Sequence, residues 1–298
     1  MDSNTHKFSR LMLGTVQFGM TYGIANTAGK PSFERVCEIL KTAVEGGVTA
    51  LDTAAAYGTS EEVLGEALEV LGLREAMTVI SKVPPIRAET DAEAEQFIEK
   101  TLRESLKRLK LEQLAVCLLH REEDLRFFPI LEKMVGRGLI GGAGVSLDSD
   151  RFIFDVASIQ YIQLPYNVLD KRFDAFWPEV KRNGIQVFTR SVYLQGLLLM
   201  PEDKIRPELA EVIPVRRKLE NIASSADCSM AELCIRYVLS NSAVTSALTG
   251  VDTVEQMREN LRLASLGPLP KELVSQIDEC VPELPESVIR PALWSTRS

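Results

Sequence analysis

Short apolar runs recur along the chain, and amphipathic segments separate them. Each run is nearly continuous rather than alternating, which is typical of strands that are buried on both faces of a parallel sheet. The runs occupy residues 10–19, 47–53, 77–83, 114–120, 139–146, 159–166, 184–191 and 244–250. The hydrophobic pattern therefore predicts eight parallel strands.

The segments between these runs carry the start signals of helices. Thr59, Thr90 and Ser229 are each followed three positions later by Glu, which is the spacing of a capping box. Apolar residues then follow Thr59 at helical spacing. These are Val63, Leu64, Ala67, Leu68 and Leu71. We expect a helix that begins near Ser60.

Eight alternations of strand and helix imply parallel pairing through right-handed crossovers. We expect one (β/α)8 TIM barrel over residues 1–298, and an open doubly wound sheet is the main competitor. The glycines at 141–144 do not complete a G-x-G-x-x-G turn, because Leu147 occupies its last position. Residues 199–213 are predicted to be an inserted loop, and the tail 268–298 is predicted to fold back as a flap.

The composition limits which binding partners and which cellular compartment we expect. The net charge of -8 and pI of 5.1 offer no basic face to nucleic acid or to an anionic membrane. The cysteines form no C-x-x-C pair, and the chain has neither an apolar leader nor an apolar run of membrane-spanning length. We expect a soluble, cytoplasmic protein with reduced thiols. His6 and His120 are too few for a multi-histidine metal site. The sequence carries no signal of oligomeric state.

Side chains that could take part in catalysis lie where the predicted strands end. Asp52, Lys82 and His120 close the second, third and fourth runs, and Tyr57 follows Asp52 in the next loop. In a barrel these positions converge on the C-terminal face, where active sites lie. An ammonium beside a phenol favours the phenolate, a carboxylate keeps the lysine charged, and a histidine can donate to a substrate oxygen. Such a set donates a proton to a developing alkoxide, and the hydride must come from a cofactor.

Each of these residues also has a plainer explanation when it is taken alone. Asp52 could form a turn or a cap, Tyr57 could pack, Lys82 could be a solvated strand end, and His120 could be structural. Their joint placement on successive strand ends favours a site.

The chain resembles the aldo-keto reductases over nearly its whole length. The resemblance rests on an ordered set of segments. These are "LGTVQFG", "LDTAAAYGTSEEVLG", "ISKV", "LLH", "GVS" (144–146), "QLPYN" (163–167), "SVYLQGLL" (191–198) and "TGVDTVEQMREN" (249–260). They are similar to the family's first strand, its Asp/Tyr signature, its lysine and histidine strands, its fifth and sixth strands, its cofactor loop and its adenosine-phosphate motif.

The resemblance implies a role for each matching residue. Tyr57 is the general acid, Lys82 the ammonium beside it, Asp52 the partner of Lys82, and His120 orients the carbonyl. The remaining candidates bind the cofactor: Thr15 near the nicotinamide ribose, Ser146 and Gln163 at the carboxamide, Arg190 under the nicotinamide, Ser191 and Gly196 at the pyrophosphate, and Gly250, Gln256 and Asn260 at the adenosine.

These roles imply NADPH-dependent reduction of an aldehyde or ketone, with NADH left open as the cofactor. The opening segment through "YGIANTAGKPS" resembles relatives associated with sugar metabolism, so a sugar-type carbonyl is one candidate substrate. Three alternatives stay open: a sugar dehydrogenase working oxidatively, a non-catalytic cofactor-binding regulatory barrel, and a barrel of another chemistry such as an isomerase or hydrolase.

The chain departs from the family pattern at three positions. Leu147 replaces an Asn, and Asp252 stands where a basic residue is common. Asp252 either repels a 2′-phosphate or caps the following helix. Arg190 replaces an aromatic residue that stacks on nicotinamide. A guanidinium can stack on the neutral reduced ring but repels the cationic oxidised ring, and it could alternatively anchor an anionic substrate group.

If Arg190 disfavours the oxidised ring, Arg190→Tyr should change the ratio of the two dissociation constants in favour of the oxidised cofactor. Titration of both proteins with both redox forms measures this ratio. An unchanged ratio would contradict the hypothesis.

Overall fold

The computed structural model describes residues 8–26, 29–152 and 159–294. The expectations for the leader, for His6 and for the last four residues of the tail lie outside the described residues, as do residues 27–28 and 153–158 of the predicted single domain.

The described residues form eight parallel strands that close into a barrel in chain order. The strands are β1 (Leu11–Gly14), β2 (Ala50–Asp52), β3 (Thr78–Val83), β4 (Val116–Leu119), β5 (Ala143–Ser146), β6 (Tyr161–Pro165), β7 (Gln186–Arg190) and β8 (Val244–Gly250). Each lies within one of the predicted apolar runs. The barrel closes because β8 pairs with β1, with Gly14 opposite Gly250. The eight-stranded barrel is thus confirmed, and the open sheet is excluded.

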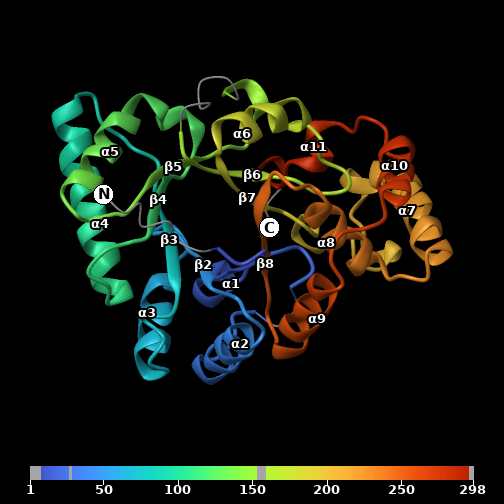
Figure 1. Ribbon diagram of the computed structural model, residues 1–298, viewed down its shortest axis with the longest axis horizontal. Coiled ribbons are helices and arrows are strands. Elements are labelled where there is room, and N and C mark those ends of the chain that lie inside the picture. Colours follow the sequence, from blue (N-terminus) through green and yellow to red (C-terminus); the bar gives the residue numbers. More distant parts are fainter. Residues whose placement is uncertain (1–7, 27–28, 153–158, 295–298) are drawn as a thin grey trace.

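Helices surround the strands on the outside (Figure 1). They are α1 (Val16–Gly19), α2 (Phe33–Glu45), α3 (Ser60–Val70), α4 (Asp91–Leu109), α5 (Phe128–Gly136), α6 (Trp177–Asn183), α7 (Ile213–Ser225), α8 (Met230–Ser240), α9 (Val254–Ser265), α10 (Lys271–Cys280) and α11 (Glu286–Ile289). Their apolar faces pack on the strands, so that each strand is covered on both sides.

Only part of the predicted capping is correct. Helix α3 begins at Ser60 as expected, but Thr59 makes no capping bond, because its backbone (φ -93°, ψ 14°) is not in the extended conformation of an N-cap residue. Thr90 and Glu93 form both bonds of a capping box. Ser229 accepts from the Glu232 amide at 3.1 Å, while the Glu232 carboxylate pairs with Arg236.

The inside of the barrel is apolar at its N-terminal end. A cluster of buried side chains fills it. The cluster comprises Met12, Ala50, Ile80, Val116, Leu118, Tyr161 and Phe188. Phe8 closes this end, with its ring centroid 4.8 Å from that of Phe188 and 6.2 Å from that of Tyr161. The polar residues of the strands are thereby left to the opposite end.

Two predicted irregular segments are ordered. Residues 199–213 are not a plain loop, because 3-10 turns form at Glu202–Lys204 and Pro207–Val212 and α7 begins at Ile213. Beyond residue 267, α10 packs beside α7 and is followed by α11 (Figure 1). Among the described residues, no helix is both long and apolar enough to cross a membrane. The five cysteines are free thiols, as predicted.

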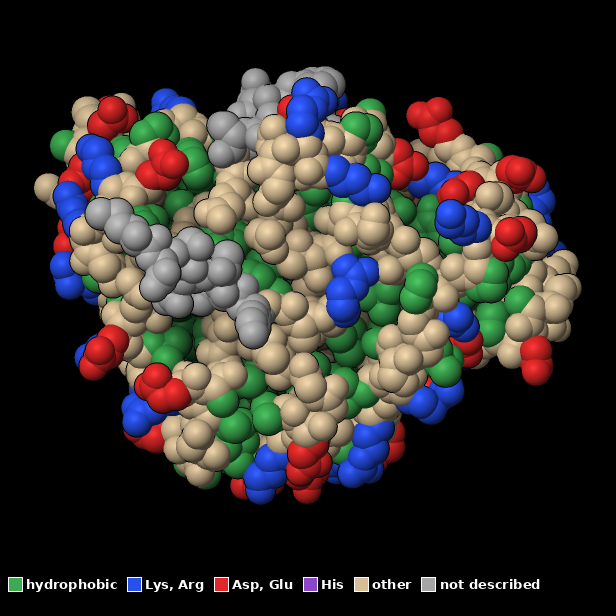
Figure 2. Space-filling model, in the orientation of Figure 1, with side chains coloured by type: hydrophobic (Ala, Val, Ile, Leu, Met, Phe, Trp, Pro, Cys, Tyr) green, Lys and Arg blue, Asp and Glu red, His purple; other side chains and the backbone are tan. Residues whose placement is uncertain are grey.

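Charged side chains of both signs are mixed around the edge of the face in Figure 2, and they do not gather there into a basic patch.

Helix α3 follows the loop that carries Tyr57, and it packs unusually closely on α4 at Gly65. A Cβ atom at this position would lie 2.2 Å from the Arg108 carbonyl oxygen and 2.7 Å from Leu109 Cα. Beside this contact, the buried Glu61 carboxylate accepts hydrogen bonds from Ser81 and Arg108. The close approach fixes α3 against β3 and α4.

We expect Gly65→Ala to lower the free energy of unfolding by about 1–3 kcal/mol, since a backbone contact must give way. Gly136→Ala is the matched control, because Gly136 is exposed at the end of α5 and an added Cβ meets nothing within 4 Å. Urea unfolding of both variants measures the difference. Equal midpoints for the two variants would contradict the role of Gly65.

Candidate active site

A buried ion pair joins the ends of β2 and β3. Lys82 Nζ lies 2.7 Å from each carboxylate oxygen of Asp52 and 2.9 Å from the Thr53 carbonyl oxygen. Both side chains are almost fully buried. The Gln163 amide from β6 donates a further hydrogen bond to Asp52 Oδ1 at 2.8 Å. The carboxylate is therefore fixed from two directions.

The surroundings of Lys82 keep it charged. Burial by itself lowers the pKa of the Lys82 ammonium, but Asp52 and Tyr57 outweigh burial and raise that pKa above its usual value. The site therefore holds a fixed cation at neutral pH.

Tyr57 reaches this cation from the loop between β2 and α3. Its hydroxyl oxygen lies 3.5 Å from Lys82 Nζ, and Nζ lies 5.0 Å from the centroid of the ring. The loop turns tightly, since the Tyr57 amide donates to the Ala54 carbonyl oxygen at 3.0 Å. Gly19 packs directly under the turn, and a Cβ there would lie 1.9 Å from the Tyr57 carbonyl oxygen. Small residues in this loop leave the phenol open to the pocket.

His120 completes the group from the end of β4. Its backbone amide donates to the Val83 carbonyl oxygen at 3.1 Å, and its ring meets that of Tyr57 edge-on at 5.6 Å. Burial, reinforced by the positive charges of Lys82 and Arg190, lowers the pKa of His120 to about 3. The imidazole is neutral at neutral pH. Nδ1 is buried and has no hydrogen-bond partner among the described residues.

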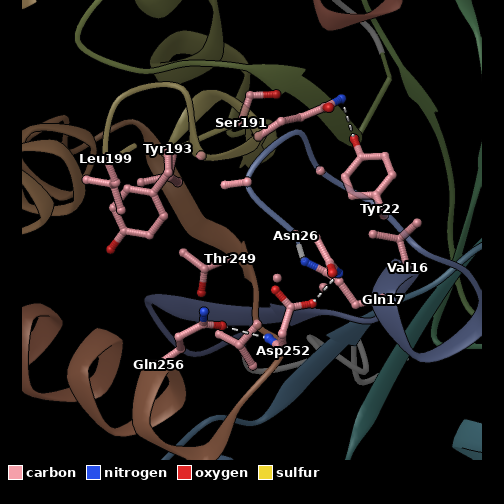
Figure 3. A pocket seen from close by; sticks show the side chains of 18 of the residues that line it. Val16, Gln17, Tyr22, Asn26, Ser191, Tyr193, Leu199, Thr249, Asp252 and Gln256 are labelled. Atoms are coloured by element: carbon pink, nitrogen blue, oxygen red, sulfur yellow. Dashed lines mark hydrogen bonds between the residues drawn. The ribbon is translucent and has the colours of Figure 1, made fainter. Parts of the chain in front are cut away.

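A pocket of about 860 Å³ opens above these strand ends, and Figure 3 shows part of its wall. Asp52 and Tyr57 line it, and the lining continues to α9. Seven predicted cofactor residues also line this pocket: Gln163, Arg190, Ser191, Gly196, Gly250, Gln256 and Asn260. Residues far apart in the sequence thus meet around a single cavity.

Thr15 and Ser146 are not among the described residues that line the pocket. The Thr15 hydroxyl is fully buried; it donates to the Asp52 carbonyl oxygen at 3.0 Å and lies 2.9 Å from Ser60 Oγ. Ser146 is also buried, next to Gln163 in the register of β5 and β6. Thr15 supports the strand ends in this structure.

The segment after β7 has an unusual backbone. Ser191, Leu194, Gln195 and Gly196 all have positive φ, which coils this segment at the edge of the pocket. Glycine is required at 196, because φ is 92° and a Cβ there would lie 2.4 Å from Ala25 Cβ. The segment after β1 therefore packs directly on the segment after β7.

Arg190 is held by a partner that the sequence did not reveal. Its guanidinium donates to Asp148 Oδ1 at 2.7 Å and to the Leu147 carbonyl oxygen at 3.1 Å. Arg290 donates to the other oxygen of Asp148 at 2.8 and 3.0 Å. Burial would raise the pKa of Asp148, but the two arginines outweigh it and lower that pKa. The charge of Arg190 is thus balanced in part, and its position is fixed.

Other pocket residues also escaped the sequence analysis. Gln17 and Thr249 also line the pocket, although their oxygens Gln17 Oε1 and Thr249 Oγ1 are buried away from solvent and have no partner among the described residues. A Cβ at Gly250 would lie 2.4 Å from the Gln17 amide. Tyr22 and Asn26 line the same pocket (Figure 3). Polar side chains thus contribute to the wall of the pocket beside its apolar residues.

Within the described ranges, no three His, Cys, Asp or Glu side chains are grouped as a metal site would require. The chemistry available from the side chains is therefore that of a lysine-supported phenol beside a neutral imidazole.

Known proteins resemble this chain in sequence and in fold. The family model described as "Aldo/keto reductase family" matches residues 10–282. The L-galactose dehydrogenase of Arabidopsis thaliana is 26% identical over 90% of each chain. The NADH-specific methylglyoxal reductase of Escherichia coli is 24% identical over 72% of this chain and 78% of its own. The aldo-keto reductase AKR11C1 from Bacillus halodurans superposes with a TM-score of 0.78 at 21% identity, over 95% of each chain.

The depressed pKa of His120 predicts a pH dependence of stability. Between pH 6.5 and 5 the unfolded chain binds a proton at His120 that the folded chain does not. The free energy of unfolding should therefore fall as pH falls, with a contribution approaching about 1.4 kcal/mol per pH unit.

His120→Asn should remove this contribution, because the amide does not titrate. Urea unfolding of both proteins at intervals from pH 5 to 8 measures the difference. Parallel curves across pH 5–6.5 would show that His120 is not held neutral.

Proposed function

The chain belongs to the aldo/keto reductase family and is an NAD(P)H-dependent oxidoreductase, and from this premise we propose that it reduces a small aldehyde or ketone with Tyr57 as the proton donor. The observation that carries the proposal is the contact of Lys82 Nζ with both Asp52 and Tyr57 at the wall of a pocket of about 860 Å³.

The pocket wall suits a nicotinamide dinucleotide. Gln163, Arg190 and Ser191 lie near the catalytic group, whereas Gln256 and Asn260 lie on α9. Gln17 and Thr249 add polar side chains to the same lining. When bound, the cofactor supplies the hydride.

The proton comes from the protein. Tyr57 releases its hydroxyl proton to the carbonyl oxygen as negative charge develops there. Lys82 stabilises the resulting phenolate through its ammonium at 3.5 Å. Asp52 holds Lys82 charged and in place, and Gln163 holds Asp52. Asp52, Lys82 and Gln163 are all buried, so their positions are fixed by packing as well as by these bonds.

The neutral imidazole of His120 carries one N–H and faces the Tyr57 ring. We assign it the orientation of the carbonyl oxygen, by hydrogen bonding. A neutral imidazole can do this without competing with Tyr57 as the proton donor.

The substrate class follows from the relatives rather than from the pocket. L-galactose dehydrogenase acts, by its name, on a sugar, and this supports a sugar-type carbonyl for the present chain. The same residues serve oxidation of the corresponding alcohol, so sugar dehydrogenation is the alternative direction. A regulatory barrel that binds the cofactor without turnover is the second alternative, favoured by Arg190 and Leu147 in place of the family's residues.

We expect Tyr57→Phe to lose carbonyl reduction by at least about 100-fold, because the proton donor is removed. Cofactor affinity should stay within about threefold of the parent. Oxidation of NADH and NADPH is followed with a panel of aldehydes, ketones and aldoses. Tyr161→Phe is the matched control, since Tyr161 lies at the opposite end of the barrel.

Activity that survives in Tyr57→Phe would overturn the assignment of the proton donor. Tight cofactor binding with no turnover of any carbonyl or alcohol would favour the regulatory barrel instead.

A further inference from the structure

The proposed function, on which this inference rests, fixes which end of the pocket holds which end of a bound dinucleotide. The reacting nicotinamide has to lie beside Tyr57, where the proton is supplied. The rest of a dinucleotide then runs along the pocket toward α9, whose residues Gln256 and Asn260 form part of the lining. The adenosine ribose therefore lies near the turn between β8 and α9.

Asp252 occupies that turn and lines the pocket. It does not cap α9, because Thr253 is the N-cap residue and its hydroxyl accepts from the Gln256 amide at 3.2 Å. The Asp252 amide instead donates to Gln256 Oε1 at 2.7 Å. The capping explanation for Asp252 is therefore wrong, and its carboxylate is available for another role.

Asn26, in the segment that follows β1, lies beside this carboxylate and orients it (Figure 3). Its Nδ2 donates to Asp252 Oδ1 at 2.9 Å, and its Oδ1 accepts from the Gly29 amide at 2.8 Å. Because the Gly29 amide can only donate, the side-chain amide of Asn26 must present its nitrogen to Asp252. No described residue donates to Asp252 Oδ2, so this oxygen keeps its acceptor capacity.

Two further carboxylates lie in the lining near Asp252. Glu255 and Glu259 on α9 also line the pocket. The basic side chains from the 199–213 segment that line it are already paired, Lys204 with Asp203 at 3.5 Å and Arg206 with Glu208 at 3.3 Å. A dianionic phosphate at the turn would therefore meet a fixed carboxylate and no free counter-charge among these residues.

We propose that the chain selects NADH over NADPH, and that Asp252, positioned by Asn26, is the residue that determines this specificity. The carboxylate accepts hydrogen bonds from the free hydroxyls of the adenosine ribose and repels a 2′-phosphate.

The test is a binding measurement on the whole chain. Dissociation constants for NADH and NADPH are obtained by calorimetry, for the parent, for Asp252→Asn and for Asp227→Asn. The asparagine at 252 keeps the shape of the side chain and removes its charge. Asp227→Asn is the matched control, because Asp227 is exposed between α7 and α8 and does not line the pocket.

We expect the parent to bind NADH at least about tenfold more tightly than NADPH, and Asp252→Asn to reduce that ratio about tenfold or more. Asp227→Asn should leave the ratio unchanged. The fragments 5′-ADP and 2′,5′-ADP should show the same preference and the same response to Asp252→Asn, which assigns the effect to the adenosine end.

Equal or tighter binding of NADPH by the parent would overturn the inference and leave the proposed reductase function standing. An unchanged ratio in Asp252→Asn, or an equal change in Asp227→Asn, would remove Asp252 as its cause. Failure to bind either dinucleotide would instead overturn the proposed function itself.

Discussion

The buried ion pair between Lys82 and Asp52 is the interaction on which the site depends. An isolated ammonium inside a barrel loses several kcal/mol of hydration, and a carboxylate 2.7 Å away is what makes its burial tolerable. Breaking such a pair by removing one partner costs about 3–5 kcal/mol, because the other charge stays buried. The pair requires β2 and β3 to be neighbours. The same strand pairing that forms part of the barrel therefore also brings the two charged side chains together.

The two ends of the barrel differ: apolar packing dominates one end, and the polar side chains of the candidate site lie at the other. Aromatic and aliphatic side chains around Phe8 and Phe188 close the N-terminal end, and the buried Ser246 hydroxyl there donates to the Ser9 carbonyl oxygen at 2.7 Å. At the other end, Asp52, Lys82 and Gln163 replace apolar packing with fixed hydrogen bonds. Tyr57 is then placed by a turn whose small residues allow Gly19 to pack directly beneath it.

The strands, and the gathering of Asp52, Tyr57, Lys82 and His120 near their ends, could be predicted because the signals are local. An apolar run that ends in Asp52 or His120 places that side chain at a strand end, whatever the rest of the chain does. Contacts across long sequence separations gave no such signal: Asn26 meets Asp252 226 positions later, and Asp148 meets Arg290 142 positions later. The capping box predicted at Thr59 is absent because the turn after Tyr57 holds the Thr59 backbone out of the extended conformation that a cap requires, and the residue spacing alone does not reveal this.

The link from Arg190 through Asp148 to Arg290 has a practical consequence for work with shortened versions of the protein. Arg290 lies near the C-terminus, yet it supplies one of the two cations around Asp148. Without Arg290, Asp148 keeps Arg190 as its one arginine partner, and Arg190, which lines the pocket, loses part of the network that fixes it. A shortened version of the protein therefore keeps this network only if it retains residue 290.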